Sequence, residues 1–183
     1  RDGIHDNNQF VEEDLNGDIV TGNYSDGMQV IGKGKILTIP MPIPPQSALR
    51  AEIYPGGGRD HRGIVHICMN TMFQTLWDGK KLSSIPNYPV TASYFFYEDP
   101  DDYTDYLGVN NGLMVCPENG GMNQVRVFPG NKRNKIVSIV RDGKGRLMLG
   151  GFQGLSFLDG DRMRHLPDQE FSYDQGANAM QKD

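Results

Sequence analysis

The sequence predicts an all-β fold built from four consecutive four-stranded antiparallel sheets, with almost no helix. Three observations predict it. One complete four-strand unit spans residues 136–167, weaker copies of this unit occur upstream, and the 183 residues include 23 glycines and 11 prolines. Glycine and proline at this level suit a chain with many short strands and as many tight turns.

The unit at 136–167 has four short strands, each joined to the next by a turn. We expect the strands at Ile136–Val140, Arg146–Leu149, Leu155–Leu158 and Arg162–Leu166. Asp142–Gly145 forms the first turn, and Pro167 ends the last strand because proline has no amide hydrogen to give to a sheet. Hairpin turns between consecutive strands indicate an antiparallel meander.

The same order of turn aspartate, middle glycine and closing proline recurs upstream. The predicted turns are Asp14–Gly17, Asp60–Gly63, Asp99–Asp105 and Asp142–Gly145, and their aspartates are separated by 46, 39 and 43 residues. Four-stranded repeats of this length are typical of β-propeller blades. We therefore predict one β-propeller segment over residues 1–183, with repeats at about 8–50, 51–90, 91–134 and 135–173 and the start of a further repeat at 174–183.

The upstream copies also contain runs with strand character. They are Phe10–Glu13, Asp18–Thr21, Met28–Ile31 and Lys35–Ile39 in the first copy, Ile64–Cys68 and Gln74–Trp77 in the second, and Ala92–Glu98 and Gln124–Phe128 in the third. The segment Pro40–Pro45 is too rich in proline for a helix, so we expect an extended link between two blades.

Composition and charge exclude several classes of partner. The formal net charge is −5 and lysine and arginine form no cluster, so we predict no nucleic-acid partner. No apolar run approaches the ~20 residues of a membrane-spanning helix, which argues against direct membrane contact. The N-terminal residues resemble a polar loop without a signal segment, and the last ten resemble the start of a repeat. We expect a piece of a longer repeat array.

The sequence offers no catalytic residue, no metal ligand set and no cofactor motif. The four histidines, His5, His61, His66 and His165, lack zinc-site spacing, and His66 alternates with apolar neighbours as a core histidine would. No serine is flanked by the glycines of a nucleophile elbow. Cys68 and Cys116 lie on strands of different repeats, so we expect free thiols rather than a disulfide.

One acidic run could in principle hold calcium through several carboxylates. Its members are Glu98, Asp99, Asp101, Asp102 and Asp105. The run lacks the glycine and the bidentate glutamate of a calcium-binding loop, so we expect a solvated hairpin.

Two stretches carry a resemblance to a known repeat. F-V-E-E-D-L-N-G-D-I-V-T-G at Phe10–Gly22 and S-I-V-R-D-G-K-G-R-L-M-L-G at Ser138–Gly150 resemble two-component regulator propeller repeats, and Asp2–Ile4 is similar to the D-G-L that precedes each first strand in that family. The W-I-G-T of the family's second strand is replaced here by V-T-G, H-I-C, Y-L-G and M-L-G.

The resemblance implies an architecture and a location. Such repeats build seven-bladed propellers, often two in tandem, in the periplasmic or extracellular sensor regions of membrane-anchored bacterial hybrid histidine kinases. Many of these kinases respond to breakdown products of polysaccharides. This chain contains no kinase, receiver or DNA-binding part, so the resemblance assigns it the sensing or scaffolding share of the function and not an enzyme activity.

In a propeller the sheets bury both faces against their neighbours, which leaves the loops to recognise a ligand. The middle loops and the blade-to-blade loops lie at one end, and their amides, arginine and aromatic rings suit an oligosaccharide. The residues we predict to bind it are Asn8, Tyr24, Tyr88, Asn110, Arg133, Gln153 and Tyr173. The alternative is that asparagine and glycine occur in these loops merely as turn formers.

Two other functions remain open at this stage. Propeller lyases that inactivate streptogramins have a comparable D-G-x-x-W repeat and use a metal held near the channel mouth, where this sequence offers only His5. A scaffold that dimerises its parent receptor would bind no small molecule.

Four blades leave the outer faces of the first and fourth sheets uncovered. By pattern we expect these faces to include Val11, Ile19, Leu147, Leu149 and Leu155. Large apolar patches rarely face water, so we expect the remaining blades of the parent chain, or another copy, to cover them. A small ring closed by Ala177–Lys182 is the other possibility.

Overall fold

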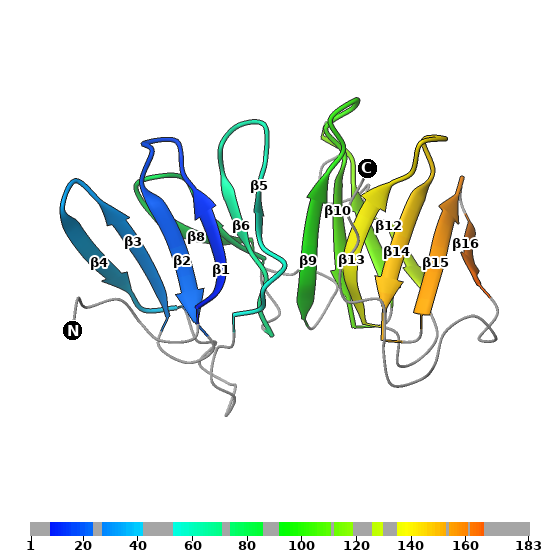
Figure 1. Cartoon of the computed structure of the whole chain (residues 1–183), viewed down its shortest axis with the longest axis horizontal. Coiled ribbons are helices and arrows are strands. Elements are labelled where there is room, and N and C mark those ends of the chain that lie inside the picture. The colour runs from blue at the N-terminus through cyan, green and yellow to red at the C-terminus, as the bar shows by residue number, and fades with distance from the viewer. Residues whose placement is uncertain are drawn as a thin grey trace. The chain divides into compact units, whose positions relative to one another are not determined.

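The computed structural model describes residues 8–23, 27–41, 53–70, 74–85, 92–110, 112–118, 126–129, 135–152, 154–160 and 162–166. These residues form sixteen strands and no helix (Figure 1). The strands make four separate four-stranded sheets, and in each sheet the strands are antiparallel and neighbours in sequence are neighbours in space. The predicted all-β meander is confirmed.

The chain divides into two compact units, residues 1–93 and 94–183. The first unit contains two sheets. Sheet 1 consists of β1 (Asn8–Glu13), β2 (Ile19–Asn23), β3 (Met28–Gly32) and β4 (Lys35–Ile39), and sheet 2 consists of β5 (Gly58–Arg59), β6 (Val65–Ile67), β7 (Gln74–Trp77) and β8 (Leu82–Ile85).

The second unit contains the other two sheets. Sheet 3 begins with β9 (Ser93–Glu98), whose first residue belongs to the first unit, and continues with β10 (Asp105–Val109), β11 (Gly112–Cys116) and β12 (Arg126–Pro129). Sheet 4 consists of β13 (Ile136–Arg141), β14 (Leu147–Gly151), β15 (Gly154–Asp159) and β16 (Arg162–His165).

The first turn of every sheet forms where the sequence predicts it. In three of them the glycine amide donates to the carbonyl of the turn aspartate, at 3.1 Å for Gly17, 2.9 Å for Gly63 and 3.0 Å for Gly145. These three glycines have φ between 76° and 79°, a conformation that L side chains rarely adopt. The stretched turn of sheet 3 instead places Tyr103 at φ 54°.

Each turn is also held by the side chain of its aspartate. Asp14 Oδ1 accepts hydrogen bonds from the backbone amides of Asn16 and Asp18, at 2.8 and 3.1 Å. A carboxylate that accepts hydrogen bonds from the backbone amides two and four residues ahead gives these amides a local partner in place of water. The D-x-x-G signature is therefore a self-capping turn.

In the first unit, apolar residues of sheets 1 and 2 and of the segments beside them form one core. Its buried members are Phe10, Val20, Met28, Val30, Met41, Ile53, Val65, Ile67, Met69 and Trp77. The turns contribute as well, because the Trp77 indole donates to Asp14 Oδ2 at 2.9 Å and the Arg59 guanidinium donates to the Glu13 carbonyl at 3.0 Å. Sheets 1 and 2 thus pack face to face.

In the second unit, sheets 3 and 4 form the other core. Its buried members are Tyr106, Leu113, Val115, Ile136, Ile139, Leu147 and Leu149. The expectation that Leu147 and Leu149 lie on an uncovered outer face is therefore wrong. Leu147 pairs with Leu158 and Leu149 pairs with Ser156, on the face of sheet 4 that packs on sheet 3. Leu155 lies on the opposite face of sheet 4 and is half-buried.

We expected the acidic run of sheet 3 to form a solvated hairpin. This expectation is wrong for one of its residues. Asp99 is buried: its Oδ1 accepts the Asp101 amide at 3.0 Å, and its other oxygen forms an ion pair with Arg141 of sheet 4. Asp101 and Asp102 are exposed, as predicted. The buried carboxylate is explained by its cationic partner, since burying an unpaired charge would be very costly.

Candidate ligand site

Four side chains of the second unit gather at one end of sheets 3 and 4. Tyr94 lies at the start of β9, Asn110 follows the end of β10, Lys135 precedes β13 and Phe152 follows the end of β14. Neighbouring strands are antiparallel, so the start of β9 and the end of β10 share one end of sheet 3, as the start of β13 and the end of β14 do in sheet 4. Packing of the two sheets brings these ends together.

The contacts within this cluster are polar and aromatic. The Lys135 ammonium lies 4.8 Å from the centroid of the Tyr94 ring and 5.6 Å from that of Phe152, within the range of cation–π attraction. The Tyr94 hydroxyl donates to Asn110 Oδ1 at 2.5 Å. Tyr94 is 8% exposed whereas Phe152 is 50% exposed, so Tyr94 supports the cluster from below and Phe152 presents a ring to solvent.

This arrangement suits recognition of a polar molecule that has an apolar face. An exposed aromatic ring can stack on the C–H face of a sugar. The ammonium beside it donates hydrogen bonds to hydroxyl or carboxylate oxygens, and the rings hold it in place. Among the four residues of the cluster, no nucleophile is paired with a base.

Of the seven residues predicted to bind a ligand, two lie in the described part of the chain. Asn110 belongs to the cluster, and Asn8 is exposed at the start of β1 in the first unit. The other five lie outside the described residues: Tyr24, Tyr88, Arg133, Gln153 and Tyr173. His5 of the lyase alternative also lies outside them.

Sequence reasoning missed Tyr94 and Lys135 as site residues. Tyr94 was assigned to the aromatic strand run, although it stands at the end of that strand where loops converge. Lys135 adjoins residues of the predicted recognition loop, and a cation next to an exposed aromatic position is a usable signal for such a site.

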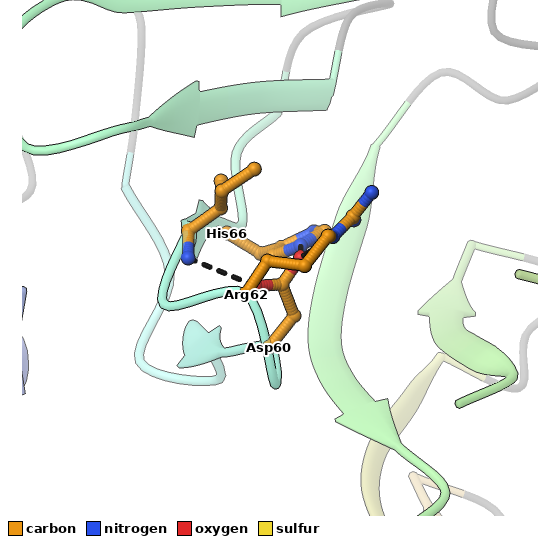
Figure 2. Close-up of polar contacts among 4 residues, drawn as sticks. Asp60, Arg62 and His66 are labelled. Atoms are coloured by element: carbon orange, nitrogen blue, oxygen red, sulfur yellow. Dashed lines mark hydrogen bonds and ion pairs between the residues drawn. The ribbon is translucent and has the colours of Figure 1, made fainter. Parts of the chain in front are cut away.

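A second polar cluster lies at the first turn of sheet 2, between β5 and β6. Figure 2 shows Asp60 with Arg62 and His66 converging on its carboxylate. Asp60 Oδ2 accepts from the Arg62 guanidinium at 2.6 and 2.9 Å and lies 3.3 Å from His66 Nε2, while Oδ1 accepts the Ile64 amide at 2.8 Å. His66 is buried, as predicted for a core histidine.

This cluster is a structural cap. Asp142 holds the equivalent turn of sheet 4, accepting the Lys144 and Arg146 amides at 2.9 and 2.8 Å and the Arg146 guanidinium at 2.7 Å. Asp14 and Asp99 likewise cap their own turns with one oxygen and bind a donor with the other. A role repeated in four sheets belongs to the fold.

Acid is expected to destabilise the first unit through Asp60. Burial alone raises the pKa of its carboxyl, but hydrogen bonds from His66, the Ile64 amide and Arg62 outweigh it and lower the pKa from 3.8 to about 2. Because the folded pKa is below the unfolded one, the carboxylate's contribution of roughly 2 kcal/mol is present above pH 4 and lost as the pH falls toward 2. Unfolding followed by Trp77 fluorescence should show a flatter acid dependence in Asp60→Asn over this interval. Equal dependence in the two proteins would contradict the assignment.

Other chemistry is sparse in the described residues. No group of three or more His, Cys, Asp or Glu side chains in that part of the chain could hold a metal ion. Cys68 and Cys116 are both free, and burial raises the pKa of the Cys68 thiol to about 12, which leaves it unreactive. Among the described residues, no helix has the length and apolar character to cross a membrane.

No protein-family model and no curated protein sequence matches the chain. Among solved structures, it is similar to the extracellular domain of BT4673 from B. thetaiotaomicron, a protein assigned to a hybrid two-component system. The TM-score is 0.66 at 18% sequence identity, and the match covers 87% of this chain and 22% of that domain. The chain therefore spans less than a quarter of the length of this neighbour.

Two further structures are similar. Virginiamycin B lyase from Staphylococcus aureus has a TM-score of 0.61 at 15% identity, over 87% of this chain and 56% of the lyase. PorZ, a surface component of the type-IX secretion system of Porphyromonas gingivalis, has a TM-score of 0.56 at 12% identity, over 81% and 24%. The fold is propeller-like. At these identities the likeness shows the fold alone, and the four sheets are consistent with propeller blades.

Proposed function

We propose that this chain is a ligand-recognising segment of the extracellular sensor region of a bacterial two-component system. In this proposal its four sheets are blades of a seven-bladed ring in a membrane-anchored receptor, and the ligand is an oligosaccharide. The observation that carries the proposal is the cluster of Tyr94, Asn110, Lys135 and Phe152 at the loop end of the second unit. The repeat resemblance and the likeness to the BT4673 domain support it.

In this proposal the cluster binds the ligand and takes no part in a reaction. Phe152 supplies the stacking surface and Lys135 the charged donor. Tyr94, held to Asn110 within sheet 3, supports the Lys135 ammonium across the two sheets. Removing the exposed ring should cost about 1 kcal/mol of stacking, which corresponds to a roughly fivefold to tenfold weaker affinity.

Binding is best measured by calorimetry with a panel of neutral and acidic oligosaccharides. Phe152→Ala and Lys135→Ala are each expected to weaken the binding of any saccharide that the unchanged chain binds. Tyr103→Ala and Lys144→Ala are matched controls, because they remove an exposed aromatic ring and a lysine at the turn end of the same unit. Both controls should bind normally.

The same measurement distinguishes the alternatives. If Phe152→Ala and Lys135→Ala bind as tightly as the unchanged chain, the cluster is not the recognition site. If no saccharide binds and virginiamycin B is consumed only when a divalent metal is added, the lyase function replaces the sensor function. If neither occurs, the segment serves as a scaffold.

A further inference from the structure

The Lys135 ammonium of the cluster has no anionic partner within the described part of the chain. Its contacts there are the rings of Tyr94 and Phe152, and Lys135 itself is half-buried. Aromatic rings attract a cation through their quadrupole, but they do not neutralise its charge. A partly desolvated charge is stabilised by an opposite one, so this position favours an anion.

The topology of the second unit separates its charges. The cluster lies at one end of sheets 3 and 4, the loop end, and the first turns of both sheets lie at the other, the turn end. The ends of the two sheets match, because Asp99 pairs with Arg141 at the turn end while Lys135 meets Tyr94 at the loop end. The described carboxylates of these sheets all belong to the turn end: they lie in or beside the first turn of sheet 3 (Glu98–Asp105), after β11 (Glu118), in the first turn of sheet 4 (Asp142) and at the end of β15 (Asp159).

The sequence shows the same separation around Lys135. No aspartate or glutamate occurs between Glu118 and Asp142. β13, which leads from Lys135 to the turn end, has six residues. At about 3.3 Å per residue it spans about 20 Å, whereas the Debye length is about 8 Å at physiological ionic strength. The carboxylates of the turn end therefore do not offset the charge on Lys135.

We infer that the cluster selects acidic saccharides, those whose sugar rings carry a carboxylate or a sulfate group, over neutral ones. The inference rests on the proposed function and names the class of ligand for the same site. Phe152, which is 50% exposed, contacts the sugar ring, and Lys135 donates charge-assisted hydrogen bonds to the acidic group. The ammonium lies 5.6 Å from the Phe152 centroid, a separation within the span of one monosaccharide, so one acidic sugar can contact both.

Calorimetry of the whole chain with matched pairs of ligands tests this selection. Oligomers of galacturonic, glucuronic and mannuronic acid are each compared with their methyl esters, which keep the sugar ring and lose the charge. An acid is expected to bind about tenfold more tightly than its ester. Sulfated oligosaccharides form a second arm, which distinguishes a sulfate from a carboxylate as the acidic group. Raising the ionic strength to about 1 M, where the Debye length is about 3 Å, should reduce the difference between acid and ester.

Variants assign the selection to one side chain. Lys135→Met keeps an apolar side chain and removes the charge, so it should abolish the difference between acid and ester, whereas Lys135→Arg should preserve it. Phe152→Ala should weaken the binding of acid and ester by the same factor, because both carry the sugar ring. Lys144→Met is the control: Lys144 is an exposed lysine at the turn end, and both affinities should stay unchanged. Far-UV circular dichroism verifies folding, and Lys135→Gln replaces Lys135→Met if the latter fails to fold.

The outcomes separate this inference from the proposed function. If esters or neutral saccharides bind as tightly as the acids, the inference is overturned and the proposed function stands. If Lys135→Met still prefers the acid over its ester, the acidic group is recognised elsewhere, which also overturns the inference. If no saccharide of either kind binds, the inference and the proposed function are both wrong.

Discussion

Asp60→Ala is expected to lower the free energy of unfolding of the first unit by about 3 kcal/mol, as removal of one partner from a buried charge network does. The change leaves the buried His66 ring without its carboxylate partner and the Ile64 amide without its cap. Arg62 can turn to water, since 52% of its side chain is exposed, so the loss comes mainly from the buried partners.

Urea unfolding followed by tryptophan fluorescence measures this loss. Trp77 is the single tryptophan of the chain and lies in the core of the first unit, so its signal reports the unit that contains Asp60. Asp142→Ala is the control, because the equivalent hydrogen bonds of its turn are exposed to solvent. It should lower the free energy of unfolding much less, as followed by far-UV circular dichroism. A midpoint for Asp60→Ala equal to that of the unchanged chain would rule out the structural role.

The turns and strands could be predicted because their causes are local. Asp14 and Asp142 accept amides two and four residues ahead, and Gly17 and Gly145 adopt the positive φ that closes the turn. Neither feature depends on a distant residue. This is why even the weaker second copy, at Asp60–Gly63, was located correctly from its D-x-x-G letters.

Which face of a sheet meets its neighbour could not be predicted in the same way. Alternation places Leu147 and Leu149 on one face, but it does not say whether Leu155 across the turn shares that face. The register decides it: Leu155 pairs with Gly150, so it lies opposite to Leu149. A difference of one residue in turn length would have reversed the answer.

Contacts between segments far apart in the chain could not be predicted from the sequence either. Asp99 was expected to lie in a solvated hairpin because its acidic run lacks the glycine and the bidentate glutamate of a calcium-binding loop. Its partner Arg141 lies 42 residues away on another sheet. The candidate site likewise depends on contacts between segments far apart in the chain. Tyr94 and Lys135 meet only because two sheets pack, whereas Asn110 was found from its place in a predicted loop.

Gly108→Ala is expected to destabilise the second unit by about 3 kcal/mol, the upper end of what overpacking a core costs. A Cβ at this position of β10 would lie 2.2 Å from the Ile136 carbonyl oxygen and 2.9 Å from its carbon, and backbone atoms cannot turn aside as a side chain can. Sheets 3 and 4 would therefore have to separate along β10 and β13.

Gly143→Ala is the matched control. Nothing lies within 4 Å of its added Cβ, and the smaller entropy of the unfolded chain should stabilise this variant by about 0.5 kcal/mol. Urea unfolding followed by far-UV circular dichroism should move the midpoint down for Gly108→Ala and slightly up for Gly143→Ala. Equal midpoints for the two variants would show that the sheets approach each other less closely at Gly108 than the structure indicates.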